Sequence, residues 1–469
     1  MDISFIGGAY KTFSTTLNAQ ECVNFIPVMG NEGPALRGSP GLKEWVDTAN
    51  YAEVRGEKKM GSGLYVVVGN VVYKILKTGS KTTCSGNLDT SSGALPESCM
   101  AENGSQLMIV DGQFGYIVSG TTVTKITDAD FPSNPESVTY QDGYFIVTFA
   151  NSGRCYVSDL NDGSSWDGTL YFNPQHRADN SLCAFSHRRK LLVLGADTSQ
   201  LYYNAGDVDE PFKVVPGTAQ EVGVGSGKSV VLLDNALFYL TNKNQVVKHQ
   251  LGSNPTAIAP PSVEYQISKY SKKDDAVGMG ITNIEGHTFY VLFFPSANAT
   301  WAFDIITKEP FQLMSYPEPW DNRWRGNCYA YFAGKHIVGD YQNGKLYELD
   351  FDTFLDNGQT SRRVRTAPTI KKEGKRIFHH KLEVFFESGV GITTGQGSDP
   401  QVMLQYSDDG GHAWGNELWR GAGKIGKYKW RAVWNRLGNS RQRNYRLIVS
   451  DPVKWVFTGA NLEATVGSA

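Results

Sequence analysis

The sequence predicts an all-β protein, in which a six- or seven-bladed β-propeller is followed by a C-terminal β-sandwich. Glycine is the first reason, because it accounts for 50 of 469 residues, above the usual share of about 7%, often in turn-like pairs such as Asp111-Gly112. The second is a hairpin-like unit that recurs seven times before residue 351. The third is strict apolar and polar alternation after residue 366, which is typical of half-buried strands.

The recurring unit is an apolar run, a turn of glycine, asparagine or aspartate, and a second apolar run. The second run carries, in order, Tyr73, Tyr116, Tyr156, Tyr202, Val247, Trp301 and Tyr347, at intervals of 40 to 54 residues. A four-stranded propeller blade takes roughly 40–50 residues. The spacing therefore predicts six or seven blades. Irregular hairpins in another kind of long all-β protein are the alternative that the pattern alone leaves open.

The chain divides into four predicted segments. Residues 1–50 form an N-terminal arm and interface segment, 51–350 the propeller, 351–366 a linker, and 367–469 the β-sandwich. Helices are scarce, and the two short candidates are residues 42–48 and 351–355. Because the linker is polar, we expect limited proteolysis at residues 359–365 to release two stable fragments.

Two alternating segments define the predicted sandwich. In residues 377–387 one face carries Phe378, His380, Leu382, Val384 and Phe386, which places His380 in the core and its neighbour His379 in solvent. In residues 427–433 an apolar face of Tyr428 and Trp430 opposes Lys427, Lys429 and Arg431. We expect these three cations to form an exposed row on one strand.

The charge is unevenly distributed along the chain. Residues 361–469 carry 18 Lys and Arg against 9 Asp and Glu, a balance of +9, so residues 1–360 carry −11 within a net charge of −2. The exposed row of Lys427, Lys429 and Arg431 is therefore a candidate docking patch for an acidic neighbour. A basic face that contacts only solvent is the alternative.

One short motif in the sandwich segment resembles an Asp-box. Ser407, Asp409, Gly411 and Trp414 match its pattern, except that Ala413 replaces the usual hydroxyl residue, and a weaker relative spans residues 159–166. The carboxylate accepts backbone N–H groups in an Asx turn, and glycine supplies a positive φ. We therefore interpret the motif as a structural hairpin tip.

Several functional classes lack support in the sequence. No apolar run approaches the roughly 18–20 residues of a membrane helix, so we expect no membrane insertion by this chain. The six cysteines form no CxxC pair and the eight histidines are dispersed, which predicts no metal site. No nucleophile elbow or cofactor loop is visible. We expect no enzyme and no cofactor, and synthesis in a reducing cytoplasm.

Five segments carry a resemblance to a known family: residues 20–25 with 36–42, and residues 374–378, 395–402 and 450–454. They resemble the packaged-DNA stabilisation proteins of tailed bacteriophages, which form the tail hub or nozzle of short-tailed phages. The resemblance is dispersed over nearly the whole chain and is densest at its two ends.

The resemblance implies a structural virion protein of the phage tail, made in the host cytoplasm. It implies a homo-oligomer, a hexameric ring, beside the portal-adaptor ring, with a tail fibre or spike and a tail needle or plug as neighbours. Double-stranded DNA would pass through its channel without sequence-specific binding. It implies no catalytic, cofactor-binding or metal-binding residues. The alternative is a sialidase-like glycan-acting or glycan-binding propeller, which would require arginines converging on a pocket with Tyr and Glu.

Overall fold

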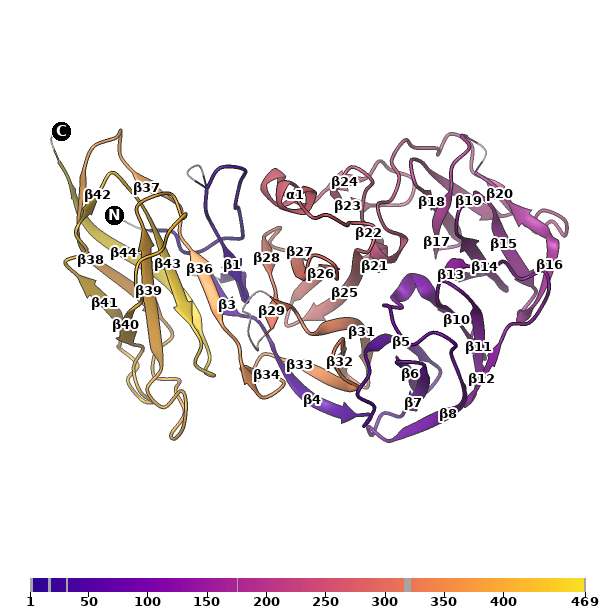
Figure 1. Cartoon of the computed structure of the whole chain (residues 1–469), viewed down its shortest axis with the longest axis horizontal. Helices are drawn as coiled ribbons and strands as arrows, with labels where there is room; N and C mark the ends of the chain where they lie inside the picture. The colour runs from indigo at the N-terminus through magenta and orange to yellow at the C-terminus, as the bar shows by residue number, and fades with distance from the viewer. Residues whose placement is uncertain (1–2, 16–17, 31–32, 175, 316–321, 468–469) are drawn as a thin grey trace.

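The computed structural model describes residues 3–15, 18–30, 33–174, 176–315 and 322–467. It consists of a ring of β-sheets and, beside it, a second body of two packed sheets that holds the C-terminal hundred or so residues (Figure 1). The all-β class, with a propeller followed by a sandwich, is confirmed.

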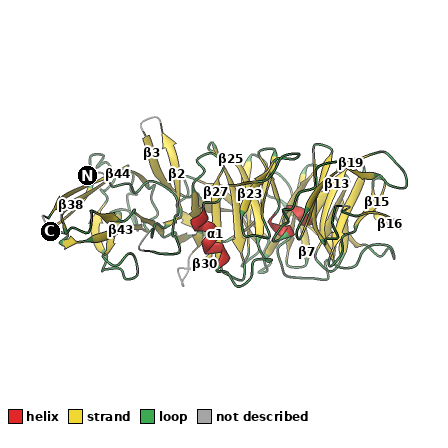
Figure 2. Ribbon diagram, turned by 90° about the horizontal axis from the view of Figure 1, so that it is seen from above, coloured by secondary structure: helices red, strands yellow, loops and turns green. Residues whose placement is uncertain are grey.

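Among the described residues, seven antiparallel units of four strands form the blades, the higher of the two predicted counts. The ring that these units form is visible in Figures 1 and 2. The first three blades are β5 (Val54–Met60), β6 (Gly63–Val68), β7 (Val71–Ile75) and β8 (Lys81–Asn87); β9 (Met100–Glu102), β10 (Gln106–Val110), β11 (Gly115–Ser119) and β12 (Thr122–Lys125); and β13 (Pro135–Gln141), β14 (Tyr144–Phe149), β15 (Cys155–Asp159) and β16 (Asp162–Phe172). The next two are β17 (Ser181–His187), β18 (Lys190–Gly195), β19 (Ser199–Asn204) and β20 (Phe212–Val214); and β21 (Val231–Leu233), β22 (Ala236–Leu240), β23 (Val246–His249) and β24 (Thr256–Ala257).

The last two blades connect to the rest of the chain. The sixth is β25 (Val277–Ile284), β26 (His287–Phe294), β27 (Ala299–Asp304) and β28 (Pro310–Gln312). The seventh is β31 (Gly326–Phe332), β32 (Lys335–Asp340), β33 (Lys345–Asp350) and, from the N-terminal region, β4 (Gly41–Asp47). Two short strand pairs flank β31–β33 in sequence. The pair before these strands is β29 (Met314–Ser315) with β30 (Asn322–Arg323), and the pair after them is β34 (Leu355–Asp356) with β35 (Gln359–Thr360).

The seven repeat residues of the sequence all occupy the third strand of a blade. Tyr73, Tyr116, Tyr156, Tyr202, Val247, Trp301 and Tyr347 lie on β7, β11, β15, β19, β23, β27 and β33. Six of the seven side chains are buried. The repeat therefore marks equivalent packing positions between neighbouring blades, which is why a single period runs through an otherwise divergent sequence.

The two helices expected from the sequence are wrong. Residues 41–47 form β4, which pairs antiparallel with β33 and buries Leu42 and Val46. Residues 351–354 form a turn, followed by β34. Within the described residues the one α-helix is α1 (Pro261–Ser268), which begins with proline at its first position, where no N–H partner is needed. Two 3-10 turns, η1 (Glu97–Cys99) and η2 (Gly227–Ser229), complete the helical elements.

The sandwich consists of two sheets that include N-terminal strands. One sheet has the order β2 (Phe25–Gly30), β3 (Gly33–Gly38), β44 (Val456–Val466), β38 (Ile377–Phe386) and β41 (Ala432–Asn435), with β42 (Asn439–Ser440) on β38. The other contains β1 (Cys22–Val23), β36 (Arg363–Thr366), β43 (Gln442–Val449), β39 (Gln401–Ser407) and β40 (Leu418–Gly421), with β37 (Ile370–Lys371) on β43. In Figure 2, β2 and β3 project above the body.

The predicted linker is not a free polar segment. Residues 351–366 contain β34, β35 and β36, and β36 lies in the sandwich sheet between β1 and β43. Because β1 also pairs in parallel with β28, the sheet of the sixth blade continues into the sandwich. Arg363 and Arg365 are fully buried there, so the segment does not offer the accessible backbone that cleavage needs. One hydrophobic cluster extends from the fifth and sixth blades into the sandwich.

The orientation of the two adjacent histidines is the reverse of the prediction. His379 is 2% exposed and contacts Ser440 at 2.9 Å, whereas His380 is exposed. The pairing of β38 with β44 shifts register between His379 and Lys381, and such a bulge turns the following side chains to the other face. Phe378 is consequently exposed, while Leu382, Val384 and Phe386 are buried as expected.

Candidate docking surfaces and the axial cavity

The Asp-box segment forms a compact hairpin tip after β39. Asp409 Oδ1 accepts the Ser407 hydroxyl at 2.6 Å and the backbone N–H groups of His412 and Ala413 at 2.9 and 3.0 Å. These hydrogen bonds, led by that from Ser407, lower the pKa of Asp409. Gly411 has φ of 89° and donates its N–H to Ser407 Oγ at 2.8 Å. The missing hydroxyl at Ala413 therefore leaves the backbone geometry of the turn intact.

Trp414 does not enter the core. It is half-buried, and the guanidinium carbon of Arg446 lies 3.6 Å from the centre of its ring. Arg446 in turn donates to Glu21 at 2.6 Å, and His412 lies 3.1 Å from the Thr15 hydroxyl. The hairpin tip thus packs between the sandwich and the N-terminal arm, and its contacts hold these two parts together.

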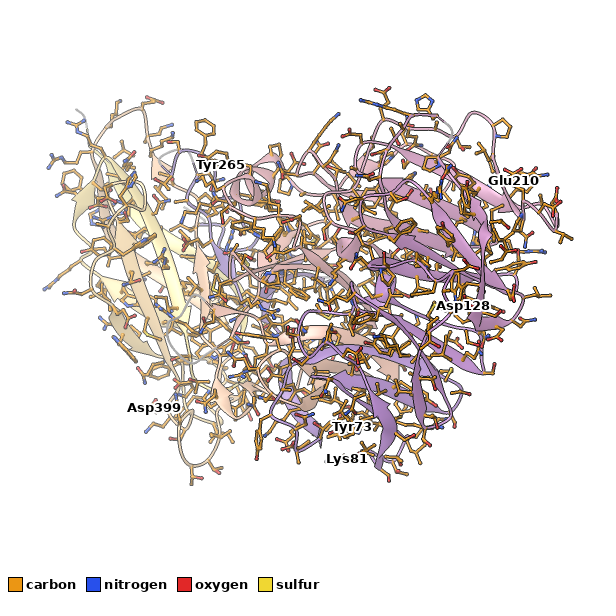
Figure 3. All side chains as sticks on the ribbon, turned by 45° about the vertical axis from the view of Figure 1, so that its right-hand side comes forward. Tyr73, Lys81, Asp128, Glu210, Tyr265 and Asp399 are labelled. Atoms are coloured by element: carbon orange, nitrogen blue, oxygen red, sulfur yellow. The ribbon has the colours of Figure 1, made fainter. Side chains whose placement is uncertain are left out.

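The related turn at residues 159–166 lies in the third blade. Trp166 is buried and donates its ring N–H to the Gly163 carbonyl at 2.9 Å. Ser165 donates to Asp159 at 2.6 Å, and Asp128, labelled on the outer side of the propeller in Figure 3, accepts the Trp166 backbone N–H at 3.0 Å. This turn therefore closes its own hairpin.

The predicted docking patch lies on a loop, not on a strand. Strand β41 begins at Ala432, so residues 422–431 form a loop after β40 that we call the basic loop. Lys427, Lys429 and Arg431 are exposed, but Tyr428 and Trp430 are also exposed, at 73% and 48%. The expectation that these two rings form a core face is wrong.

Glycines and backbone bonds explain the shape of the basic loop. Gly423 and Gly426 adopt φ of 90° and 81°, conformations that interrupt a strand. The Trp430 ring N–H donates to the Gly421 carbonyl at 2.8 Å, which holds the ring on the surface. The core position beneath is filled by Trp434, which is 1% exposed.

The three predicted cations differ in their partners. Arg431 pairs with Glu383 at 3.0 Å, and Glu383 also binds Lys381 at 2.9 Å. For Lys427 and Lys429, the described residues include no ion-pair partner. Asp399, labelled at the lower end of the sandwich in Figure 3, pairs with Lys424 of the same loop at 3.6 Å. The basic loop thus combines two exposed lysines with exposed aromatic rings. Tyr, Trp and Arg are enriched in protein interfaces, whereas Lys is depleted there, so the rings are the stronger sign of a docking surface.

A cavity of about 270 Å³ lies among the inner strands of the propeller. β5, β21, β25 and β31, which lie near the centre of the ring in Figure 1, and residues 95–97 form its sides. Glu57, Tyr329 and Tyr331 line it together with Lys58 and Lys59, and no arginine is among the lining residues that the structure describes. This cavity therefore does not meet the requirement of the glycan-acting alternative.

Sequence reasoning missed the buried arginines. Arg55, Arg363 and Arg365 are each at most 1% exposed. Arg55 donates to the carbonyls of Gly93, Gly69 and Thr90 at 2.8, 3.0 and 2.9 Å, and burial lowers the pKa of Arg363 to about 10. The sequence offered one sign of this strand. Arg363 and Arg365 alternate with β-branched residues, and residues two apart in a strand place their side chains on the same face.

Other ligand classes gain no support from the described part of the chain. The residues placed by the structure include no group of three or more His, Cys, Asp or Glu side chains suited to a metal ion. Within the same residues no helix has the length and hydrophobicity that crossing a bilayer requires. All six cysteines are buried free thiols.

Comparison with known proteins identifies the family. A family profile described as bacteriophage P22 Gp10, beta-propeller, matches residues 1–354, and one described as bacteriophage P22 Gp10, beta-sandwich, matches residues 362–465. No curated protein sequence matches the chain significantly.

Solved structures resemble the chain only weakly. The N-terminal domain of Nup159 has 10% identity and a TM-score of 0.42, with 70% of this chain and 97% of that chain covered. The Pan2 WD40 domain of Neurospora crassa has 8% identity and a TM-score of 0.38, with 66% and 96% covered. The computationally designed Ika8 protein has 9% identity and a TM-score of 0.37, with 66% and 99% covered. Similarity at this level carries no functional information.

The two family matches together span nearly the whole chain, which therefore belongs to the bacteriophage P22 Gp10 family and is a structural protein of a phage tail.

Proposed function

We propose that the chain is a tail-hub or nozzle subunit that assembles into a hexameric ring, retains packaged DNA and forms part of the channel through which DNA leaves the virion. The proposed neighbours are the portal-adaptor ring, a tail fibre or spike, and a tail needle or plug. Membership of the P22 Gp10 family supports this assignment at the level of a structural tail protein.

The continuity of the two bodies is the observation that best supports the role. The sheet that begins at β25 in the sixth blade runs through β28 and β1 to β40 at the edge of the sandwich. A subunit that confines DNA under pressure has to transmit force without bending between its parts. A shared sheet and a shared hydrophobic cluster provide that stiffness, because interiors packed in this way deform little.

The distribution of charge supports separate roles for the two bodies. We propose that DNA passes a wall poor in exposed cations, supplied by the acidic part of the chain, which carries −11 over residues 1–360. Each phosphate neutralised by Lys or Arg would add about 0.9 to the salt slope of binding and retard the duplex. The basic loop, with Lys427, Lys429 and Arg431, would instead dock an acidic neighbour, such as the propeller of the next subunit.

Electron microscopy of the purified full chain, alone and mixed with portal and adaptor proteins, tests the proposal. Sixfold rings in class averages are the expected result, and their abundance should fall as salt rises above about 0.15 M, because the Debye length there is about 8 Å. In parallel, the monomer should bind a fluorescent DNA duplex weakly at that salt. Monomers that never form a ring with these proteins would refute the proposal.

A further inference from the structure

The cavity among the inner strands β5, β21, β25 and β31, which we call the axial cavity, contains a buried carboxyl group. No described residue makes a hydrogen bond of ordinary geometry to this group. Glu57 on β5 is 7% exposed, lines the cavity, and neither of its carboxyl oxygens has a hydrogen-bond partner of ordinary geometry. The Cys328 thiol lies close enough to act as a weak donor to it. A buried polar group without partners costs about 1–3 kcal/mol, so its retention in a cavity requires an explanation.

The backbone around Glu57 is arranged to form this cavity. A Cβ at Gly56 would lie 2.2 Å from the Leu95 carbonyl oxygen, so only glycine lets residues 93–96 lie against β5. The Leu95 N–H donates to the Arg55 carbonyl at 2.7 Å, which fixes this contact. On the other side, a Cβ at Gly278 would lie 2.2 Å from the Ser229 carbonyl oxygen. Close backbone approach on both sides thus defines the cavity walls.

Several other polar groups that line the cavity already have partners. Lys58 binds Glu97 at 3.3 Å, and the Asn327 side-chain nitrogen donates to Glu53 and to the Val54 carbonyl, both at 2.9 Å. The Tyr329 hydroxyl contacts His336 at 2.9 Å. The remaining donors, Lys59 and Tyr331, are exposed side chains, and neither carboxyl oxygen of Glu57 receives a hydrogen bond from them. A ligand that satisfies Glu57 therefore has to bring a donor.

We propose that the axial cavity binds an alkyl cation, which is an ammonium or guanidinium group on a short aliphatic stem, with Glu57 as the anionic partner. A guanidinium or ammonium group makes charge-assisted hydrogen bonds to a carboxylate and neutralises its buried charge. Leu95, Val231 and Met279, all buried, offer an apolar surface for the stem. The proposal is independent of ring assembly.

The size of the cavity fits such a ligand. Its volume of about 270 Å³ lies below the roughly 300–1,000 Å³ of pockets for drug-sized ligands. The exposed side chains of Lys59, Thr282 and Tyr331 stand at its mouth. A free alkyl amine could enter through this mouth, and so could the Lys or Arg side chain of a partner protein, because both carry the same chemistry.

Binding should be linked to proton release. Burial raises the pKa of the Glu57 carboxyl well above its usual range, and a cation would restore the carboxylate. The other titratable groups lining the cavity are Lys58 and Lys59 on β5, Glu97 on η1, and Cys328, Tyr329 and Tyr331 on β31, while β21 and β25 contribute none among the described lining residues. Lys58 is paired with Glu97, so Glu57 is the group expected to lose its proton.

Isothermal titration calorimetry of the full chain with agmatine tests the proposal. We expect saturable binding, and Glu57→Gln should weaken it by about tenfold or more. The matched control is Glu210→Gln, which removes an exposed carboxylate outside the cavity lining, at the outer edge of the propeller in Figure 3, and should change the affinity by less than about threefold. Titrations in two buffers of different ionisation enthalpy should reveal proton release when the parent protein binds agmatine.

Two further arms make the experiment decisive. Thr282→Trp narrows the mouth without altering Glu57 and should weaken binding even if Glu57→Gln proves unstable. Titration with arginine blocked at both ends separates the sources: binding of the blocked residue favours a partner's side chain, and binding of agmatine alone favours a free amine. The proposal is overturned if agmatine does not bind at about 10 mM, or if Glu57→Gln and Thr282→Trp, both folded, bind as the parent does.

Discussion

The guanidinium group of Arg365 donates from Nε to the carbonyl oxygen of Phe5 at 2.7 Å, across 360 residues of chain. The same side chain donates to the Gly8 carbonyl at 2.5 Å, to Gln20 Oε1 at 2.7 Å and to the Glu21 carbonyl at 3.3 Å. One buried cation on β36 therefore connects residues 5, 8, 20 and 21 of the N-terminal arm to the sandwich.

Replacing Arg365 should destabilise the entire chain. In Arg365→Leu, the acceptors at Phe5, Gly8 and Gln20 lose their donor, whereas the Glu21 carbonyl keeps the Thr366 N–H at 2.9 Å. Each buried unsatisfied group costs about 1–3 kcal/mol, so we expect a loss of at least about 3 kcal/mol. Arg376→Leu, at an exposed arginine of the same body, is the control and should stay within about 0.5 kcal/mol. Urea unfolding followed by tryptophan fluorescence measures both, and equal losses would contradict this function of Arg365.

Limited trypsin digestion should spare the segment between the two bodies. Arg363 and Arg365 are buried in β36, whereas Lys427 and Lys429 lie exposed on the basic loop. Cleavage requires local unfolding, so the first cuts should fall in the basic loop. Mass spectrometry of the early fragments checks this, and early release of a fragment ending at Arg363 or Arg365 would mean that β36 opens readily.

The Asp-box tip should contribute to stability in a pH-dependent way. The pKa of Asp409 is lowered in the folded state, chiefly by its hydrogen bond to Ser407, so its contribution is present above the usual value of 3.8 and is lost as the pH falls through the folded value. Asp409→Ala should therefore lower the thermal midpoint at neutral pH and match the parent in strong acid.

Trp414→Ala provides a comparison for the Asp409 variant. Because Trp414 is half-buried, Trp414→Ala should lower the free energy of unfolding by less than the about 3–5 kcal/mol lost when a buried tryptophan is replaced. This loss should not vary with pH. Calorimetric scans of both variants at several pH values test this pair. A cost of Asp409→Ala that persists in strong acid would contradict the assigned hydrogen bonds.

Reversing charge on the basic loop should weaken assembly without unfolding the chain. Lys427→Glu with Lys429→Glu changes two exposed cations that lack ion-pair partners in the described structure. Ring formation, measured by analytical ultracentrifugation with the adaptor, should decline, and more salt should reduce the difference from the parent. Adding Arg431→Glu places a negative charge beside Glu383, so that triple variant should also lose some stability. Normal assembly of the double variant would contradict the docking role.

Glu57 should make the protein less stable as the pH rises. Burial raises the pKa of the folded Glu57 carboxyl well above its usual value of 4.5, so between these two pKa values the group is ionised in the unfolded chain and protonated in the folded one. The folded state then binds more protons, so stability falls from about pH 5 upward. Glu57→Met should flatten this decline and raise stability by about 1–3 kcal/mol at about pH 8. Glu97→Gln is the control, and an unchanged slope in Glu57→Met would refute the assignment.

The sequence predicted what depends on local spacing. The blade repeat was visible because Tyr73, Tyr116 and their counterparts occupy equivalent places between blades. The pairing of β4 with β33 left no local sign, since a strand and its partner some 300 residues away share no pattern. The same limit applies to the buried arginines, whose acceptors come from distant parts of the chain.

Local deviations account for the errors at the candidate docking surface. Strict alternation failed at His379 because a bulge adds one residue, and it failed at Tyr428 because the strand starts only at Ala432. The charges of Lys427, Lys429 and Arg431 were correctly expected to be exposed, but the apolar rings between them could be placed only by the structure.

The pairing of β4 with β33 also determines when the molecule can finish folding. Residues 41–47 emerge from the ribosome some 300 residues before β33, residues 345–350, the strand with which they complete the seventh blade. The arm meets β44, at residues 456–466, later still. Blades one to six can form as they emerge, at about 5–20 residues per second, while β4 waits tens of seconds for its partner β33. The nascent chain therefore exposes the unpaired edge of β4 until β33 emerges. Unpaired strand edges promote aggregation, so host chaperones that shield this edge should increase the yield of folded protein.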